Sequence, residues 1–163
     1  MIRVAIALGS NMGDRLNNIR QAVHLLENRG VNVTARSDVF ETKPVGVENQ
    51  KRFLNACIVV STDMSPRRLL DEMLRIESEL GRTREVPMGP RPIDLDILLV
   101  DSMVVHEPDL EIPHPRMTER AFVLTPLAQI CPEWIHPESG LSVGRLSEAV
   151  RDSDPSIRRI TSL

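Results

Sequence analysis

Hydrophobic residues repeat with two periods along the first hundred residues, and each period predicts a different element. Strand-like alternation covers four segments, 2–9, 31–42, 52–62 and 93–100. Between the first and second segments, and between the third and fourth, apolar residues recur every three to four positions, which predicts an amphipathic helix in each place. The first helix is expected to end at Gly30, and the second to begin at Ser65-Pro66 and end at Gly81.

The predicted order β-α-β-β-α-β places the chain in the α+β class. It is the order of the ferredoxin-like split βαβ pattern, whose antiparallel sheet carries its helices on one face. We therefore predict a single domain over 1–163, with a core at 1–100 and a C-terminal extension at 101–163. Within the extension, the patterns predict a hairpin and two helices, near 103–112, 117–130 and 141–150.

Strand alternation also predicts which side chains face the helices. In the second and fourth strands these are expected to be Val31, Val33, Ala35, Val39, Ile93, Leu95, Ile97 and Leu99. The opposite face carries small, polar and aromatic residues: Ala5, Ala7, Phe53, Asn55, Asp94 and Asp96. Two segments with the composition of long loops, 43–51 and 81–92, adjoin this face, and the combination predicts a ligand site there.

Asp94 and Asp96 are the most informative pair on that face, because two neighbouring carboxylates repel each other. A divalent cation would remove the repulsion, and Mg²⁺ is usually held by one or two carboxylates together with substrate phosphates. Arg91, three residues earlier, has the planar fork that suits a phosphate. The alternative is a solvated pair of acids, which is the better interpretation of an isolated Asp-x-Asp.

Phe53 and Asn55 would suit a planar heterocycle, because an amide reads the edge of a ring and an aromatic side chain stacks on its face. The alternative is an asparagine bonded to neighbouring backbone and a phenylalanine in the core.

Basic residues at two places suggest phosphate binding. Arg82, Arg84 and Arg91 crowd one loop, which is either a clamp that closes over a nucleotide or a solvated charged loop. His114 lies between two prolines, where a neutral ring could donate to a phosphate; an ordinary surface histidine explains the sequence equally well.

Composition narrows the function classes. The net charge of −3 argues against a broad nucleic-acid or anionic-membrane surface, and no apolar run is long enough to span a bilayer. Cys57 and Cys131 lie far apart in apolar surroundings and are expected to be buried thiols. We therefore expect a cytoplasmic protein, monomeric, with small-molecule substrates.

Several stretches together resemble the 6-hydroxymethyl-7,8-dihydropterin pyrophosphokinase family of folate biosynthesis. The resemblance runs from residue 1 to about 135 and rests on Ala5-Ile6-Ala7-Leu8-Gly9-Ser10-Asn11, Phe53-Leu54-Asn55-Ala56, Ile76-Glu77, Gly81-Arg82, Gly89-Pro90-Arg91-Pro92-Ile93-Asp94-Leu95-Asp96-Ile97, Ile112-Pro113-His114-Pro115-Arg116-Met117 and Arg120-Ala121-Phe122-Val123-Leu124-Thr125-Pro126-Leu127.

The resemblance implies that ATP gives its terminal two phosphates, as pyrophosphate, to the pterin hydroxymethyl oxygen, and that AMP leaves. It implies two Mg²⁺ ions held by Asp94 and Asp96, which form the catalytic set with Arg82 and Arg91. The pterin would contact Thr42, Pro44, Val45, Phe53, Asn55 and Phe122, with its ring between the two phenylalanines. ATP would be surrounded by Glu77, Arg82, Arg84, Arg91, Ile97, His114 and Arg120.

Some positions depart from the family pattern, all on the nucleotide side: Leu74, Glu85, Met88, Asp109, Glu111 and Pro115. Two other function classes stay open. A different magnesium-dependent nucleotidyltransferase or hydrolase would explain the acids and arginines but not the aromatic pair with Asn55. A non-enzymatic module, either an RNA-binding sheet or a regulatory domain, would not require Mg²⁺-dependent nucleotide binding.

Overall fold

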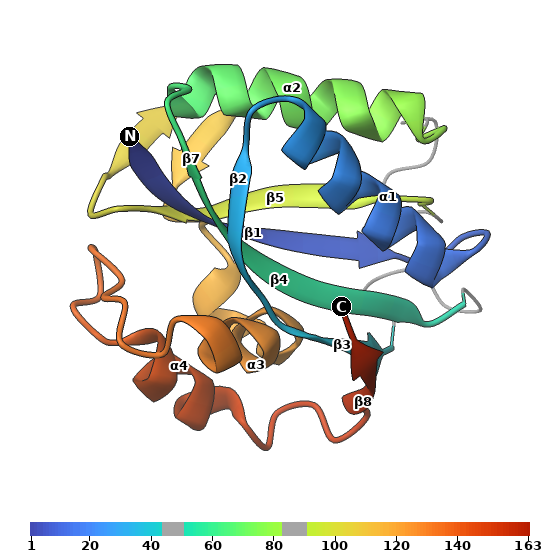
Figure 1. Ribbon diagram of the computed structural model, residues 1–163. Coiled ribbons are helices and arrows are strands. Elements are labelled where there is room, and N and C mark those ends of the chain that lie inside the picture. Colours follow the sequence, from blue (N-terminus) through green and yellow to red (C-terminus); the bar gives the residue numbers. More distant parts are fainter. Residues whose placement is uncertain (44–50, 83–90) are drawn as a thin grey trace.

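A six-stranded antiparallel sheet forms the centre of the molecule (Figure 1). The computed structural model describes residues 1–43, 51–82 and 91–163. The strand order is β5-β1-β4-β3-β8, and β2 also pairs with β4, beyond the segment that pairs with β3. The strands are β1 (Ile2–Ser10), β2 (Asn32–Arg36), β3 (Asp38–Thr42), β4 (Phe53–Thr62), β5 (Asp94–Val100) and β8 (Arg158–Ser162).

Helices α1 (Arg15–Asn28) and α2 (Pro66–Glu79) cover one face of the sheet, as the sequence predicts (Figure 1). Their apolar stripes meet the inward residues of β1 and β4 in the main core. Ser65 caps α2 by accepting a hydrogen bond from the Arg68 backbone N–H. Gly30 and Gly81 follow the helices with positive φ angles of 82° and 90°, the conformation that favours glycine after a helix.

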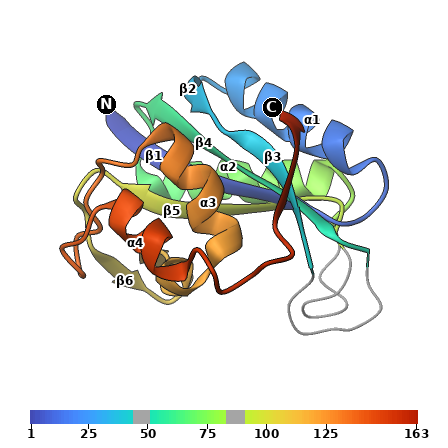
Figure 2. The same cartoon turned by 90° about the horizontal axis from the view of Figure 1, so that it is seen from below.

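The opposite face carries two further helices, α3 (Ala121–Ile130) and α4 (Val143–Val150), so the prediction that helices lie on one face only is wrong (Figure 2). A second apolar cluster joins this face to α3 and α4. Cys57 and Cys131 are buried free thiols in this cluster, as predicted, and burial raises the pKa of both. A short 3-10 turn (Met117–Glu119) precedes α3.

Two interruptions of strand register overturn predicted orientations. The predicted strand 31–42 is divided at Ser37, and its pairing with β4 shifts between Val33 and Ala35, so Ala35 packs in the second cluster. The pairing of β1 with β5 shifts in the same way, and Leu99 also packs in the second cluster. Each shift reverses the face of the side chains that follow it up to the next interruption, and Val39, after the break at Ser37, lies in the main core as predicted.

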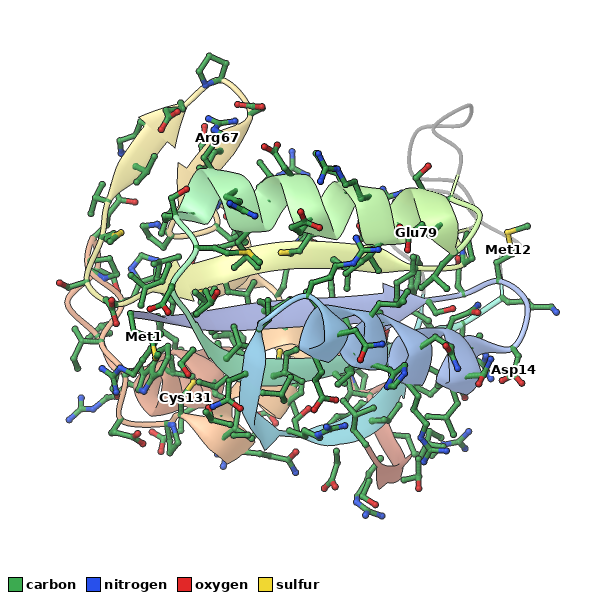
Figure 3. The ribbon with its side chains drawn as sticks, turned by 45° about the horizontal axis from the view of Figure 1, so that its top comes forward. Met1, Met12, Asp14, Arg67, Glu79 and Cys131 are labelled. Atoms are coloured by element: carbon green, nitrogen blue, oxygen red, sulfur yellow. The ribbon has the colours of Figure 1, made fainter. Side chains whose placement is uncertain are left out.

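The C-terminal extension folds against the core. The predicted hairpin is formed by β6 (Val105–Glu107) and β7 (Leu110–Ile112). Arg67, at the start of α2, holds this hairpin through Glu107 and Asp109, at 2.6 and 2.7 Å (Figure 3). The sequence pattern did not predict β8. Among the described residues, no helix combines the length and apolar character needed to cross a membrane.

Candidate active site

A pocket of about 160 Å³ opens on the same sheet face as α3, at the ends of β1, β4 and β5. It is lined by Ala7, Leu8, Gly9, Thr42, Lys43, Phe53, Asn55, Ala56, Arg91, Asp94, Asp96, Arg116, Arg120, Phe122 and Val123. The small residues of β1 leave room above the sheet, as predicted. A Cβ at Gly9 would lie 3.2 Å from the Asn55 Oδ1, so a larger residue there would crowd the amide and require a shift of a few tenths of an ångström.

One side of the pocket is aromatic and amide-bearing. Thr42 of β3 pairs with Phe53 of β4 in the ladder, and the neighbouring Asn55 donates from Nδ2 to the Thr42 Oγ1 at 2.7 Å. Phe122, in the first turn of α3, supplies a second ring. The structure therefore brings together four of the residues predicted to bind the pterin. The other two, Pro44 and Val45, lie outside the described residues.

The other side of the pocket holds the two carboxylates. Asp94 and Asp96 pair with Gly9 and Ala7 across the β1–β5 ladder and both line the pocket. Burial, together with the negative charges of Asp94 and Glu77, raises the pKa of Asp96 to about 7. A carboxyl group in these surroundings is stabilised by any added positive charge.

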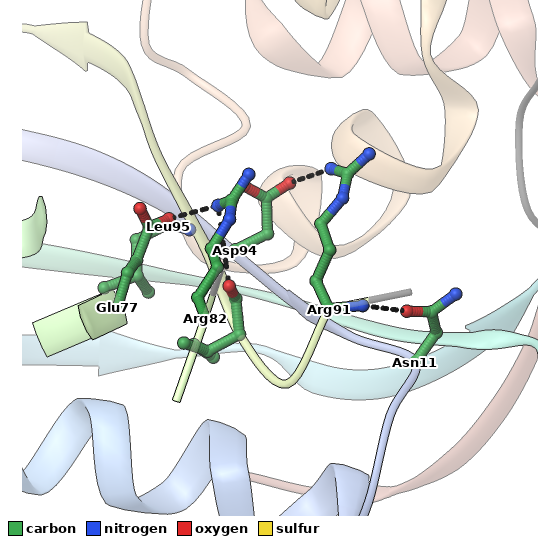
Figure 4. A network of polar contacts seen from close by, with 7 residues as sticks. Asn11, Glu77, Arg82, Arg91, Asp94 and Leu95 are labelled. Atoms are coloured by element: carbon green, nitrogen blue, oxygen red, sulfur yellow. Dashed lines mark hydrogen bonds and ion pairs between the residues drawn. The ribbon is translucent and has the colours of Figure 1, made fainter. Parts of the chain in front are cut away.

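Asp94 is held by arginines from two segments (Figure 4). Arg82 contacts the Asp94 Oδ1 at 2.6 Å, and Arg91 contacts the Asp94 Oδ2 at 2.9 Å. The Arg91 backbone N–H donates to the Asn11 Oδ1 at 2.7 Å, which ties this segment to the end of β1. Arg91 also lies over the Phe53 ring, 5.7 Å from its centroid, and so links the two sides of the pocket.

Glu77 lies behind the pocket and is not part of its lining. The side chain is buried, and its Oε2 accepts from the Leu95 backbone N–H at 2.8 Å and from Arg82 at 2.6 Å (Figure 4). Ile97 packs in the main core, on the face away from the pocket. The predicted contacts of Glu77, Ile97 and Arg82 with ATP stay predictions. Three other positions named from the sequence lie outside the described residues: Arg84, Glu85 and Met88.

His114 is half-buried, outside the pocket lining but close enough to Arg120, Asp94 and Arg116 for their charges to act on its imidazole. Burial and the charge of Arg120 lower the pKa of its imidazole to about 4, so the ring is neutral at pH 7. Its Nδ1 accepts from the Arg116 backbone N–H at 3.1 Å, which places the proton on Nε2. The ring therefore offers a donor, as the sequence interpretation requires.

Lys43 and Arg116 line the pocket but were not among the predicted site residues. Arg116 could have been found, because it stands two positions after His114 within a motif already singled out. Lys43 carries no comparable signal, since a lysine at the end of a strand is common. Arg120, a predicted residue, lies over the Phe122 ring at 5.5 Å from its centroid.

Comparisons with known proteins give one consistent result. The sequence model of the 7,8-dihydro-6-hydroxymethylpterin-pyrophosphokinase (HPPK) family matches residues 5–132. The 2-amino-4-hydroxy-6-hydroxymethyldihydropteridine pyrophosphokinase of Bacillus subtilis is 54% identical over 127 residues, covering 77% of this chain and 76% of its own. The protein of that name from Methylorubrum extorquens is 41% identical over 157 residues, covering 96% of both chains.

Longer proteins also match. The chain is 41% identical over 151 residues to the folic acid synthesis protein fol1 of Pneumocystis carinii, but spans only 20% of that protein. The crystal structure of Plasmodium falciparum HPPK-DHPS superimposes with a TM-score of 0.76 at 15% identity, covering 98% of this chain and 48% of that one. At this identity the superposition establishes the fold alone, and this chain spans less than half the length of either longer protein.

Proposed function

Since this chain belongs to the 7,8-dihydro-6-hydroxymethylpterin-pyrophosphokinase family, we propose that the sheet-face pocket is where it transfers pyrophosphate from ATP to the pterin hydroxymethyl group. The reaction is a step of folate biosynthesis and releases AMP. One observation carries the proposal: residues from β3, β4, β5 and α3, predicted from sequence to bind pterin, metal and phosphate, line one cavity.

The aromatic side of the pocket is the proposed pterin site. Phe53 and Phe122 supply the faces for stacking, and Asn55 supplies an amide whose Nδ2 is fixed by Thr42. The buried amide is pre-oriented, so little conformational entropy is lost when it bonds the ring edge. Backbone groups of Thr42, Pro44 and Val45 complete the proposed site.

The two aspartates fit a divalent cation. The raised pKa of Asp96 shows that its charge is poorly compensated, which a cation bound by Asp94 and Asp96 would correct. Among the described residues no group of three or more His, Cys, Asp or Glu could hold a metal, so substrate oxygens and water would complete the coordination. When bound, two Mg²⁺ ions would neutralise phosphate charge and make the hydroxymethyl oxygen a better nucleophile.

The chain's own contribution is positioning and charge. In the transfer, a bond forms between the hydroxymethyl oxygen and the β-phosphorus of ATP, and the bond from that phosphorus to the oxygen of AMP breaks. Arg91, Arg116 and Arg120 line the pocket and would neutralise the polyphosphate. The His114 Nε2–H, left as a donor by the bond to Nδ1, would donate to it. Arg82 orients Asp94 and is proposed to reach the phosphates during turnover. No side chain is assigned as general base, and the hydroxyl proton passes to solvent.

We also infer the ferredoxin-like split βαβ arrangement, supported by the order β5-β1-β4 with β2 and β3 beyond it. The two buried free thiols suit a reducing, cytoplasmic compartment, and two carboxylates on the binding face argue against nucleic acid.

The decisive experiment is product analysis after mixing the protein with ATP, Mg²⁺ and 6-hydroxymethyl-7,8-dihydropterin. AMP should form only when the pterin is present. Formation of ADP, or AMP release without the pterin, would overturn the proposal in favour of an ordinary kinase or a nucleotide hydrolase.

Phe122→Ala should weaken pterin binding by about 10-fold or more and leave ATP binding within about twofold, because it removes one stacking face. Phe122→Leu is the matched control, since it keeps apolar volume but has no ring. Calorimetric titration of each ligand distinguishes the two effects, and equal losses for both ligands would make Phe122 a packing residue.

A further inference from the structure

The strand β8 supports the pocket from outside the family match, which ends at residue 132. We infer that the segment from Asp154 through β8 is a positioning element for the pterin site. Arg158 contacts Glu41 and Ser156 contacts Lys43, and these two residues flank Thr42 in the chain. This inference rests on the proposed function, because it concerns the wall assigned to the pterin.

β3 depends on β8 for its place in the sheet. On one side, β3 pairs with β4 only at Phe40, Glu41 and Thr42. On the other side it pairs with β8 from Asp38 to Glu41 (Figure 1). Without β8, a five-residue strand that lines the pocket would be an edge strand, with its outer backbone groups unpaired.

Glu41 is the first link, directly before Thr42. Its side chain is 14% exposed and bridges two arginines, with Oε1 3.0 Å from Arg158 and Oε2 3.0 Å from Arg15. Arg15 also donates to the backbone carbonyl of Arg52, 2.8 Å away. One carboxylate therefore ties β8 to α1 and to the residue before β4, which begins at Phe53.

Ser156 is the second link, directly after Thr42. The Lys43 backbone N–H donates to the Ser156 Oγ at 3.4 Å. Ser156 is itself fixed by Asp154, whose Oδ1 accepts from the serine N–H at 3.0 Å and from its hydroxyl at 2.5 Å. Lys43 lines the pocket, so this contact reaches the wall itself.

These two links have a chemical consequence at Asn55. Thr42 lies between Glu41 and Lys43, and its Oγ1 accepts the 2.7 Å hydrogen bond that fixes the Asn55 amide. A displacement of Thr42 would change the direction of that amide, and hydrogen bonds weaken steeply when they are misaligned. Loss of the β8 contacts should therefore weaken pterin recognition and leave the phosphate side unaffected.

The test is the double variant Ser156→Ala/Arg158→Ala in the full chain. KM for the pterin should rise about threefold to tenfold, while kcat and KM for ATP stay within about twofold. The conservative pair Ser156→Thr/Arg158→Lys should restore most of the pterin affinity. The single variants should each show a smaller rise, which keeps the test valid if the double variant folds poorly.

Arg159→Ala is the matched control. It removes the neighbouring arginine of β8, whose partner Asp38 keeps its two contacts with Gln129. An unchanged pterin KM in the double variant, an equal rise for ATP, or an equal effect of Arg159→Ala would overturn the inference. A wild-type protein that forms no AMP would overturn the proposed function itself, and the inference with it.

Discussion

Asp94 and Asp96 line the same pocket but have different surroundings. Asp94 contacts two guanidinium groups, from Arg82 and Arg91. Burial raises the pKa of Asp96 from an ordinary value of 3.8 to about 7. The two carboxylates should therefore affect stability in opposite directions in the absence of metal.

Asp96→Asn is expected to stabilise the metal-free protein at pH 8, by on the order of 2 kcal/mol. The folded wild type holds the Asp96 proton more tightly than the unfolded chain, so the wild type gains stability from this proton at low pH and loses that gain as pH rises through 7. The advantage of the variant should therefore vanish near pH 4. Thermal unfolding between pH 4 and pH 8 in the presence of a chelator measures the difference in stability between the variant and the wild type. Asp94→Asn should instead destabilise the protein, because it removes the charge that pairs with Arg82 and Arg91. Turnover should be abolished in Asp96→Asn; retained turnover would contradict the metal assignment.

His114→Asn should reduce the acid sensitivity of the fold. The unfolded histidine binds a proton below its ordinary pKa of 6.5, whereas the folded imidazole has a pKa of about 4. The wild type therefore loses stability as pH falls from 6.5 to 4, by about 1–3 kcal/mol, and the variant should lose less. An asparagine oxygen can replace Nδ1 as acceptor for the Arg116 N–H. Urea unfolding at pH 7 and pH 4.5 gives the loss of stability on acidification for the wild type, for His114→Asn and for the control His24→Asn. An equal loss in all three proteins would refute the role of His114.

At the scale of elements, Glu77 joins α2 to β5. It accepts the backbone N–H of Leu95, which lies between the two aspartates, and it contacts Arg82. The end of the helix thereby fixes the strand that carries both carboxylates.

Glu77→Ala should lower the free energy of unfolding by about 2–4 kcal/mol, because it leaves a buried N–H without this acceptor and removes a charge partner of Arg82. Glu77→Gln should cost less, since it keeps an oxygen acceptor. Glu79→Ala is the control on the same helix: its half-exposed pair with Arg29 should contribute less than about 1 kcal/mol. Urea unfolding that gives equal values for Glu77→Ala and Glu79→Ala would contradict this role.

The elements also show where sequence reasoning succeeds and fails. Periodicity predicted β1, α1, β4, α2 and β5, because apolar residues recur with the period of the element on the side that faces the main core. It failed for Ala35 and Leu99, because a register shift depends on the partner strand and leaves no mark in local alternation. It missed β8, whose residues are mostly exposed and so lack an alternating pattern. The placement of Glu77 near the nucleotide stays a prediction; the structure shows the side chain buried, with its Oε2 accepting the Leu95 backbone N–H.

At the scale of the whole molecule, charge is unevenly distributed. The chain carries a net charge of −3, yet the pocket is lined by four cationic side chains and two carboxylates. Such a site attracts a polyanion to a protein that is otherwise slightly acidic.

ATP binding should therefore weaken with salt, while binding of the uncharged pterin should not. Between 50 and 500 mM NaCl we expect KM for ATP to rise about twofold to fivefold, because mobile ions screen the partly exposed charges. Arg116→Ala should reduce this dependence. Steady-state kinetics with each substrate varied in turn measure both, and an equal salt effect on the two KM values would argue against a charged nucleotide side.

The pairing of β3 with β8 has a consequence for synthesis on the ribosome. Glu41 and its partner Arg158 are 117 residues apart in the chain. At typical translation rates of about 5–20 residues per second, roughly 6–23 s pass between the synthesis of the two. During that interval a nascent chain has a strand edge with no partner, which a chaperone could protect or a neighbouring nascent chain could pair with.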